Sequence, residues 1–297
     1  MPFYGQIGCQ FPTKVGACKN KAYYEYQGRF GCGVHIKGGN RTELAKQPKQ
    51  EKEADDAAKY QVELREIQVV REVNYLAGRK GETRLCRMFM MKSPMHTPGY
   101  LNVYPNYKDQ GRKDGSGCAS LSPKSMGPVE HGQPGLPRSL NLENYYQSSK
   151  VFAIETNQDG SPSTLFFENQ LRFFNDAEPH RHKYKGTQEN KNIPLYFLWI
   201  DKKGKQHRLT YIQSRQFYCN FYERFALVDA NFILLKSLID TGVNLQICGY
   251  DAYGMEGTHE EAYLDPRSPY GHEKVLLAML VLNPEDYPWR KHKTFDF

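Results

Sequence analysis

The chain has little that would place it in or across a membrane. Its longest apolar run towards the end, VLLAMLVL at 275–282, is far below the roughly 18–20 residues that a spanning helix needs. The opening MPFYGQIGCQFPTK has no basic start followed by an apolar core, which argues against a secretory signal. We therefore expect no membrane partner and an intracellular, reducing location.

Cysteine is also scarce, and its count of seven is odd, so a disulfide framework is not expected. Cys9, Cys18, Cys32 and His35 nevertheless follow a C-x8-C-x13-C-x2-H spacing. Zn2+ prefers about four Cys or His ligands in a tetrahedron, and four protein ligands leave no open position for catalysis. The sequence thus predicts a structural Zn2+ site. The first spacing is looser than usual, and three unrelated thiols with a surface histidine are the alternative.

Acidic residues are sparse at the start of the chain. Residues 1–49 hold eight Lys or Arg and two acids, which is six of the seven net positive charges of the whole chain. A basic segment beside a near-neutral body is typical of contact with an anionic partner. We expect nucleic acid to contact residues 1–49, and a solvated basic tail is the alternative.

Polarity divides the chain into three segments. Residues 1–40 are turn-rich and too polar to build a core of their own, which favours a zinc-binding module. Residues 41–82 combine a polar linker with an amphipathic helix from Ala57. The apolar positions of this helix are Tyr60, Leu64, Ile67, Val70, Val73 and Ala77. Residues 83–297 carry both helix and strand patterns, and the resemblance described below implies a helix-rich α+β domain over them.

The third segment begins with a strand at 83–93 and an ordered surface loop at 94–138, rich in Gly, Pro and Ser. After it we expect a helix at 141–152, with Asn141 as its N-cap, and a second helix at 164–177. A polar loop at 178–192 and a hairpin of 193–201 with 206–211 follow. The rest of the segment predicts a helix at 214–242 that is broken near Asp229, a strand at 243–254 and a helix at 272–282.

The stretch SLNLENYYQSSKVF at 139–152 carries the pattern most suggestive of chemistry. Glu143, Gln147 and Lys150 are four and seven residues apart, so a helix places them on one face beside Tyr145 and Tyr146. Glu143 falls in the first turn, where the helix dipole favours the ionised carboxylate. Two solvated residues on an ordinary helix are the alternative to a functional pair.

Five blocks of the chain resemble the NADAR family. LNLENYYQSSKVF resembles the family's SEHYFQAQKF-type helix, and YLNVYP at 100–105 takes the place of its FSNF-P loop. Residues 221–242 are similar to its KFEQ…L…LLxT helix, GYDAYG at 249–254 to its NDAYWG, and 270–280 to its GKNxLGxxLM. The resemblance covers roughly residues 95–285. The tryptophan after NDAY is missing here, and Glu273 replaces the asparagine of GKN.

The resemblance implies a compact α+β fold and chemistry on N-glycosidic bonds. Some family members are N-glycosidases that clear riboflavin-pathway ribosylamines, and others remove ADP-ribose from guanine in DNA. We therefore expect a ribosyl or ADP-ribosyl small molecule, or a modified nucleic acid, as the substrate. The zinc-like start and the NLEN variant also resemble NADAR-related proteins of large DNA viruses, which implies host cytoplasm or virion as the location.

The resemblance also implies which residues act. The expected catalytic residues are Glu143, Lys150 and Asp251, and the expected substrate-binding residues are Tyr146, Gln147, Arg181 and Tyr253. Breaking a ribose C1–N bond builds positive charge on the sugar, which a nearby carboxylate stabilises. Lys150 is expected to bind a phosphate, to protonate the leaving group, or to form a transient Schiff base with an opened ribose.

Two interpretations remain open at this point. The retained Glu143, Lys150 and Asp251 favour an N-glycosidase-like hydrolase of a ribosyl C–N bond. The missing tryptophan and the Glu273 replacement favour an inactive binding or structural protein, associated with a virus particle, that keeps the fold and a basic zinc module.

Overall fold

The computed structural model describes residues 2, 3, 5, 7–14, 16–37, 41–46, 49–89, 94–184 and 193–297. The chain forms two compact units, Met1–Val62 and Glu63–Phe297. The boundary lies inside helix α1 (Lys49–Leu76), so the residues expected to form a linker and helix, 41–82, contribute to both units. Within the described ranges, the structure has no helix with the length and apolar character needed to cross a membrane.

The first unit consists of short strands around a very small core. Its strands are β1 (Pro12–Thr13), β2 (Gly16–Ala17), β3 (Tyr24–Tyr26), β4 (Arg29–Gly31) and β5 (Thr42–Glu43). Strands β1 and β2 form an antiparallel pair, and β3 lies between β4 and β5 in a second antiparallel sheet. The buried apolar side chains are those of Cys9, Ala22, Cys32, Ile36 and Leu44. Two of these five are predicted zinc ligands.

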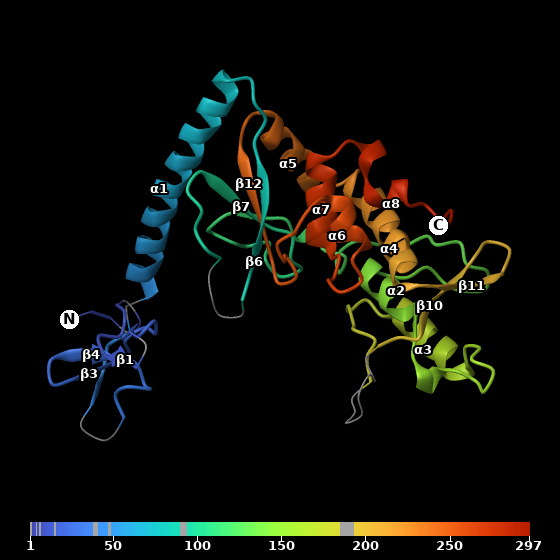
Figure 1. Ribbon diagram of the computed structural model, residues 1–297, viewed down its shortest axis with the longest axis horizontal. Helices are drawn as coiled ribbons and strands as arrows, with labels where there is room; N and C mark the ends of the chain where they lie inside the picture. The colour runs from blue at the N-terminus through green and yellow to red at the C-terminus, as the bar shows by residue number, and fades with distance from the viewer. Residues whose placement is uncertain are drawn as a thin grey trace. The chain divides into compact units, whose positions relative to one another are not determined.

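The second unit mixes helices and sheets, which confirms the α+β class (Figure 1). Its strands are β6 (Thr83–Arg87), β7 (Tyr100–Tyr104), β8 (Ser116–Gly117), β9 (Lys150–Val151), β10 (Tyr196–Ile200), β11 (Gln206–Leu209) and β12 (Asn244–Gly249). Its helices after α1 are η1 (Ala119–Leu121), α2 (Leu142–Ser148), η2 (Ala153–Glu155), α3 (Thr164–Asn175), α4 (Tyr211–Ala226), α5 (Ala230–Asp240), α6 (His259–Leu264), α7 (His272–Val281), η3 (Pro284–Asp286) and α8 (Pro288–Lys291).

A parallel sheet in the order β6-β12-β7-β8 lies at one end of the second unit (Figure 1). All six residues of β12 are buried, as expected for the middle strand of a covered parallel sheet. The expectation of one surface loop over 94–138 is wrong, because this region contains β7, β8 and η1. Strand β7 is short and follows glycine, so local pattern hides it, and its pairing with β12 makes it a strand.

An antiparallel sheet in the order β11-β10-β9 forms the other sheet of this unit. The hairpin of β10 and β11 is confirmed, and so is Asn141 as the N-cap of α2, because its side chain accepts a hydrogen bond from the Asn144 backbone N–H. The expected helix over 141–152 is too long. It ends at Ser148, because Lys150 and Val151 pair with β10 instead.

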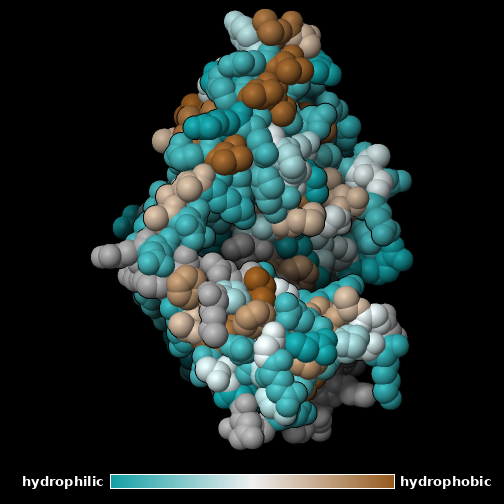
Figure 2. Space-filling view, turned by 90° about the vertical axis from the view of Figure 1, so that its left-hand side faces the viewer, coloured by the Kyte–Doolittle hydropathy of each residue, from teal (hydrophilic) through white to brown (hydrophobic). Residues whose placement is uncertain are grey.

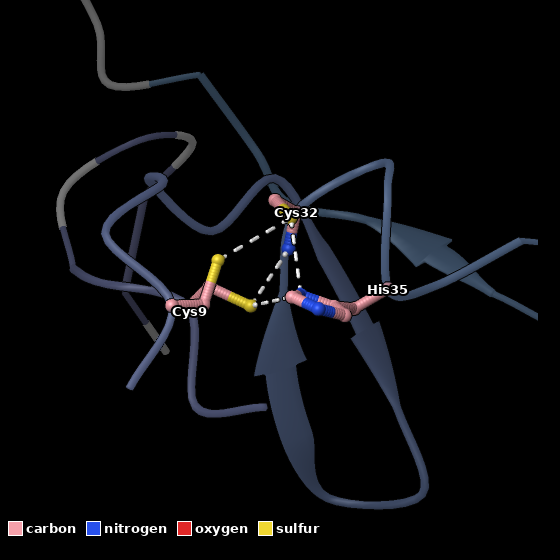
Figure 3. A group of neighbouring side chains, drawn as sticks. Cys9, Cys32 and His35 are labelled. Atoms are coloured by element: carbon pink, nitrogen blue, oxygen red, sulfur yellow. Dashed lines mark hydrogen bonds between the residues drawn. The ribbon is translucent and has the colours of Figure 1, made fainter. Parts of the chain in front are cut away.

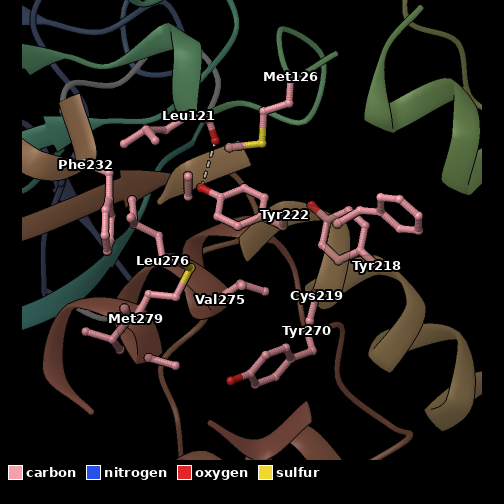
Figure 4. Close-up of a cluster of buried hydrophobic side chains, with 14 of the residues drawn as sticks. Leu121, Met126, Tyr218, Cys219, Tyr222, Phe232, Tyr270, Val275, Leu276 and Met279 are labelled. Atoms are coloured by element: carbon pink, nitrogen blue, oxygen red, sulfur yellow. Dashed lines mark hydrogen bonds between the residues drawn. The ribbon is translucent and has the colours of Figure 1, made fainter. Parts of the chain in front are cut away.

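Helices α4 and α7 lie between the two sheets and carry the main core (Figure 1). Figure 4 shows Tyr218 and Tyr222 of α4 packing with Val275, Leu276 and Met279 of α7. The buried Tyr222 hydroxyl donates to the Leu121 carbonyl at 2.8 Å. The expected break near Asp229 is confirmed, because Asp229 accepts from two backbone N–H groups at the start of α5.

The part of α1 that belongs to the second unit, residues 63–76, packs on the rest of that unit. Ile67 and Asn74 are buried there, and the Asn74 amide donates to the Gly242 carbonyl at 2.9 Å. Val73 and Ala77, expected on the apolar face of this helix, are exposed instead. Figure 2 shows hydrophobic side chains gathered at the top of the view. The exposed large hydrophobic side chains of α1 are Val62, Val69, Val73, Tyr75 and Leu76.

Two predicted segments extend past the described residues. The expected strand at 83–93 is confirmed as β6 over Thr83–Arg87, and residues 90–93 lie outside the described residues. The expected polar loop at 178–192 is described only to residue 184. The expected helix at 272–282 is confirmed as α7, although α8 follows it. Helices α6 and α8 are short and were not expected.

Candidate functional site

A cavity of about 870 Å³ lies within the second unit. Residues that directly follow two parallel strands form part of its wall, namely Asn106 to Asp109 after β7 and Tyr250 with Asp251 after β12. The carboxyl ends of parallel strands commonly open onto ligand sites, because the loops that follow them converge there. The Asn106 side-chain amide donates to the Cys248 carbonyl at 3.0 Å, which ties the two strand ends together.

Helix α2 and strand β9 supply a second part of the wall, which contains the three residues singled out in the sequence. The Gln147 amide nitrogen donates to Glu143 Oε1 at 3.0 Å, and Lys150 Nζ donates to Gln147 Oε1 at 2.8 Å. Lys150 stands on β9 rather than on the helix, yet the chain of contacts keeps all three side chains together. All three line the cavity, as does Asp251.

Burial lowers the pKa of Lys150 to about 8. The Glu143 carboxylate opposes this shift and the Arg181 guanidinium adds to it, so both groups lie within electrostatic reach of the amine. A lysine in this range carries an appreciable neutral fraction near pH 7 and exchanges its proton readily. The amine also lies 5.5 Å from the centre of the Tyr146 ring, which favours its charged form when protonated.

A buried network behind this wall fixes the orientation of the Gln147 amide. The His182 backbone N–H donates to Gln147 Oε1 at 3.3 Å, so the amide oxygen accepts from two sides. His182 Nε2 in turn lies 2.8 Å from the fully buried Glu155 carboxylate. Glu155 also accepts from Tyr184 at 2.7 Å and Asn169 at 2.9 Å. These donors keep the pKa of Glu155 below its usual range despite burial.

The remaining expected substrate-binding residues fall in different places. Tyr146 lines the cavity, and burial raises the pKa of its phenol, so the hydroxyl stays protonated. Arg181 lines it with an exposed side chain. Tyr253 lies outside the cavity lining: its hydroxyl accepts from Arg87 at 3.1 Å, and its ring stacks under the same guanidinium.

Sequence reasoning missed part of the cavity wall. Glu273, noted in the sequence only as a departure from the family's motif, is 1% exposed and lines the cavity, together with Tyr218 and Tyr270. Burial raises the pKa of Tyr218 well above its usual value, and the fields of Glu143 and Glu273 both add to the shift. The available signal was the position of Glu273 two residues after Gly271, at the start of an apolar helix.

The four predicted metal ligands converge in the first unit. The ligand atoms of Cys9, Cys18, Cys32 and His35 all lie within 4.8 Å of one another. Cys9 Sγ is 3.3 Å and Cys32 Sγ 3.4 Å from His35 Nδ1, while Cys18 Sγ is 4.0 Å from Cys32 Sγ. Figure 3 shows Cys9, Cys32 and His35 pointing toward one another.

Backbone and amide groups around the cluster point at its sulfur atoms. The Cys32 backbone N–H approaches Cys9 Sγ at 3.4 Å, and the Asn20 side-chain amide approaches Cys32 Sγ at 3.6 Å. Burial opposes ionisation of Cys32, but hydrogen bonds from His35, Asn20 and neighbouring backbone groups lower its pKa to about 6. All seven cysteines are free thiols.

Exposed cations surround this cluster along the chain. Their side chains belong to Lys14, Lys19, Lys21, Arg29, Lys37, Arg41 and Lys46. The Arg29 guanidinium lies 4.5 Å from the Phe11 ring centre, and the Arg41 guanidinium 4.1 Å from the Tyr24 ring centre. The unit therefore displays both positive charge and aromatic faces.

Comparison of the chain with family models, with curated proteins and with solved structures gives no match in any of the three. The resemblance to the NADAR family therefore stays a prediction from the five sequence blocks.

Proposed function

We propose that the cavity of the second unit cleaves a ribosyl C–N bond, as in removal of ADP-ribose from a nucleobase. One observation supports this most strongly: Glu143, Gln147 and Lys150 form a hydrogen-bonded series in the wall of a cavity that Asp251 also lines. A volume of about 870 Å³ is at the upper end of typical ligand pockets.

In this proposal Glu143 acts on the anomeric carbon. As the C1–N bond breaks, the bonding electron pair leaves with the base nitrogen and positive charge develops on the sugar ring. The Glu143 carboxylate stabilises that charge and accepts a proton from the water that attacks C1. Lys150 Nζ donates the proton that the departing nitrogen requires, which suits an amine with a pKa of about 8.

Asp251 and the aromatic side chains have supporting roles. Asp251 supplies a second carboxylate at the end of β12, in reach of the same cavity. Tyr146 offers a face on which a flat base stacks. Arg181 is an exposed cation of the lining, suited to a phosphate group of the substrate. Tyr253 has no part in this mechanism.

For the first unit we propose a structural Zn2+ ion. Zinc–ligand bonds of 2.0–2.3 Å in a tetrahedron place ligand atoms about 3.3–3.8 Å apart, close to the separations of the Cys9, Cys32 and His35 atoms. The N–H groups directed at sulfur are typical outer partners of metal-bound thiolates. Four protein ligands complete the coordination, so this metal takes no part in cleavage.

We further propose that this basic unit contacts nucleic acid, with exposed Lys and Arg on phosphates and the aromatic rings beside bases. A second candidate for the whole chain is an inactive binding or structural protein, including one within a virus particle. Two features favour that candidate: Tyr253 lies outside the cavity, and Glu273 stands where the NADAR motif has asparagine.

The experiment is an assay of ADP-ribose release from an ADP-ribosylated guanine oligonucleotide, followed by chromatography. Wild-type protein is expected to release free ADP-ribose, and Glu143→Gln to lower the rate by 100-fold or more while its thermal unfolding stays unchanged. Glu130→Gln, at an exposed acid paired with Arg138, serves as the matched control and keeps full activity. Equal rates in wild type and Glu143→Gln remove Glu143 from the mechanism.

A further inference from the structure

The carboxylate of Glu273 occupies an unusual position in the cavity wall. It stands in the first turn of α7, after Gly271, and is 1% exposed. Its side chain lies across two glycines: a Cβ atom on Gly249 would be 2.1 Å from Oε1, and one on Gly271 would be 3.0 Å from Oε2. The absence of side chains at these two positions is what allows an acid to lie there.

The hydrogen-bonding capacity of this carboxylate is largely unused. Oε1 accepts a long hydrogen bond of 3.4 Å from the Asp251 backbone N–H. Oε2 has no hydrogen-bond partner among the described residues. A buried carboxylate oxygen without a donor is costly, so its place in a cavity wall indicates that a bound molecule or water supplies the donor.

The neighbouring histidine does not meet this need. His272 Nδ1 lies 3.2 Å from Glu273 Oε2, but His272 Nε2 lies 3.0 Å from the Pro105 carbonyl oxygen. A carbonyl oxygen only accepts, so Nε2 is the donor to Pro105. The contact between His272 Nδ1 and Glu273 Oε2 lacks the geometry of a hydrogen bond, so Oε2 keeps an unused acceptor position.

Two tyrosine hydroxyls complete this part of the wall. The Tyr270 hydroxyl is also without a hydrogen-bond partner among the described residues, and its side chain is 5% exposed. The fields of Glu143 and Glu273 both reach the Tyr218 phenol. Glu143, Glu273 and Tyr218 all line the same cavity, so a ligand that fills it faces both acids.

We propose that Glu273 accepts a hydrogen bond from the C2 hydroxyl of the bound ribosyl ring, with the Tyr270 hydroxyl beside the C3 hydroxyl. The proposal rests on the proposed function, since it places C1 of the same ring at Glu143. Acidic side chains recognise ribose hydroxyls in this way in nucleotide sites, and a bond at C2 strengthens as charge develops at C1. Glu273 is thus a specificity-determining residue that selects ribose over 2-deoxyribose.

The test compares two probes, ribose 5-phosphate and 2-deoxyribose 5-phosphate, by calorimetric titration of the full-length protein. Wild type is expected to bind the ribose probe about tenfold tighter or better, as for a hydrogen bond to a charged group. Glu273→Gln is expected to bring the two affinities within about threefold by weakening only the ribose probe. Tyr270→Phe should weaken both probes alike and keep their ratio, because both carry the C3 hydroxyl.

Three results overturn the proposal: equal affinity of wild type for the two probes, an unchanged preference in Glu273→Gln, or an equal loss for both probes in that variant. The wild-type ratio decides the matter even if a variant fails to fold. Glu130→Gln should keep the wild-type ratio. Preference for ribose without release of ADP-ribose contradicts the cleavage reaction alone, and release of ADP-ribose without any preference contradicts the C2 subsite alone.

Discussion

The two units of this protein differ in how their interiors are stabilised. Met1–Val62 buries a handful of small side chains, and two of those are thiols of the Cys/His cluster. Glu63–Phe297 buries a continuous aromatic and aliphatic core in which Trp289, Tyr222 and Phe217 are fully or almost fully inaccessible. With the proposed zinc ion, the first unit is stabilised by four metal ligands, whereas the second is stabilised by the area of apolar surface removed from water.

This difference explains where a binding cavity can exist. A core as large as that of the second unit tolerates a hollow lined with Glu143, Lys150 and Glu273, because the cost of burying those groups is offset elsewhere. The first unit has no comparable apolar core, and its buried interior contains the Cys/His cluster instead.

Removal of the proposed Zn2+ ion should unfold the first unit and leave the second unit folded. Treatment with a strong chelator, or Cys32→Ser, is expected to release about one equivalent of zinc and to collapse the dispersed NMR signals of residues before Val62. Signals of the second unit should persist. Cys118→Ser, which changes a buried thiol of the second unit, should retain the zinc.

The same treatment should weaken nucleic-acid binding if the basic unit provides the contact. With zinc present, affinity for a DNA oligonucleotide should fall steeply with salt, as expected for release of counterions. A first unit that stays folded after chelation would contradict the contrast between the two interiors.

Truncating a core side chain of the second unit, which creates a new cavity, should lower the free energy of unfolding by several kcal/mol. Leu276→Ala removes a fully buried side chain and is expected to lower the free energy of unfolding by about 2–5 kcal/mol. Leu234→Ala, at a side chain that is 48% exposed, should change it by less than about 1 kcal/mol. Zinc content should be the same in both variants, and a loss of zinc from either one counts against independent interiors.

The smallest effect concerns the titration of Lys150. Its amine should react with an aldehyde and cyanoborohydride with a midpoint near pH 8, about two units below an ordinary lysine. Lys124, an exposed lysine of the same cavity lining, serves as the control, because its labelling shows that the reagent reaches the cavity. A Lys150 midpoint near 10 by mass spectrometry would show that the cavity does not desolvate it.

The sign of the linked stability follows from the same shift. Between about pH 8 and the ordinary lysine value near 10.4, the unfolded chain binds more protons at this position than the folded chain does. The contribution of Lys150 to the free energy of unfolding therefore rises with pH across that window. Lys150→Met should flatten this rise.

The sequence predicted features that depend on local chemistry. The Asn141 cap, the break at Asp229 and the Cys/His set follow from side chains a few residues apart or from ligand type, and the structure confirms the cap, the break and the convergence of the four ligands. Periodicity also predicted the hairpin of β10 and β11.

Features that depend on distant pairing were beyond local pattern. Strand β7 exists because β12 pairs with it from more than a hundred residues away, and Lys150 leaves the helix because β10 pairs with it. Glu273 was noted only as a departure from the family's motif, because no local signal shows that Gly249 makes room for its side chain. Tyr253 was expected in the cavity from a motif, but Arg87 on another strand binds it outside.

The most direct test of the central claim is a crystal structure of the Glu143→Gln variant with ADP-ribose. The account predicts the ligand in the cavity, with C1 of the terminal ribose against residue 143 and Lys150 and its C2 hydroxyl at Glu273. A ligand bound elsewhere on the protein, or an empty cavity at millimolar ADP-ribose, would contradict it.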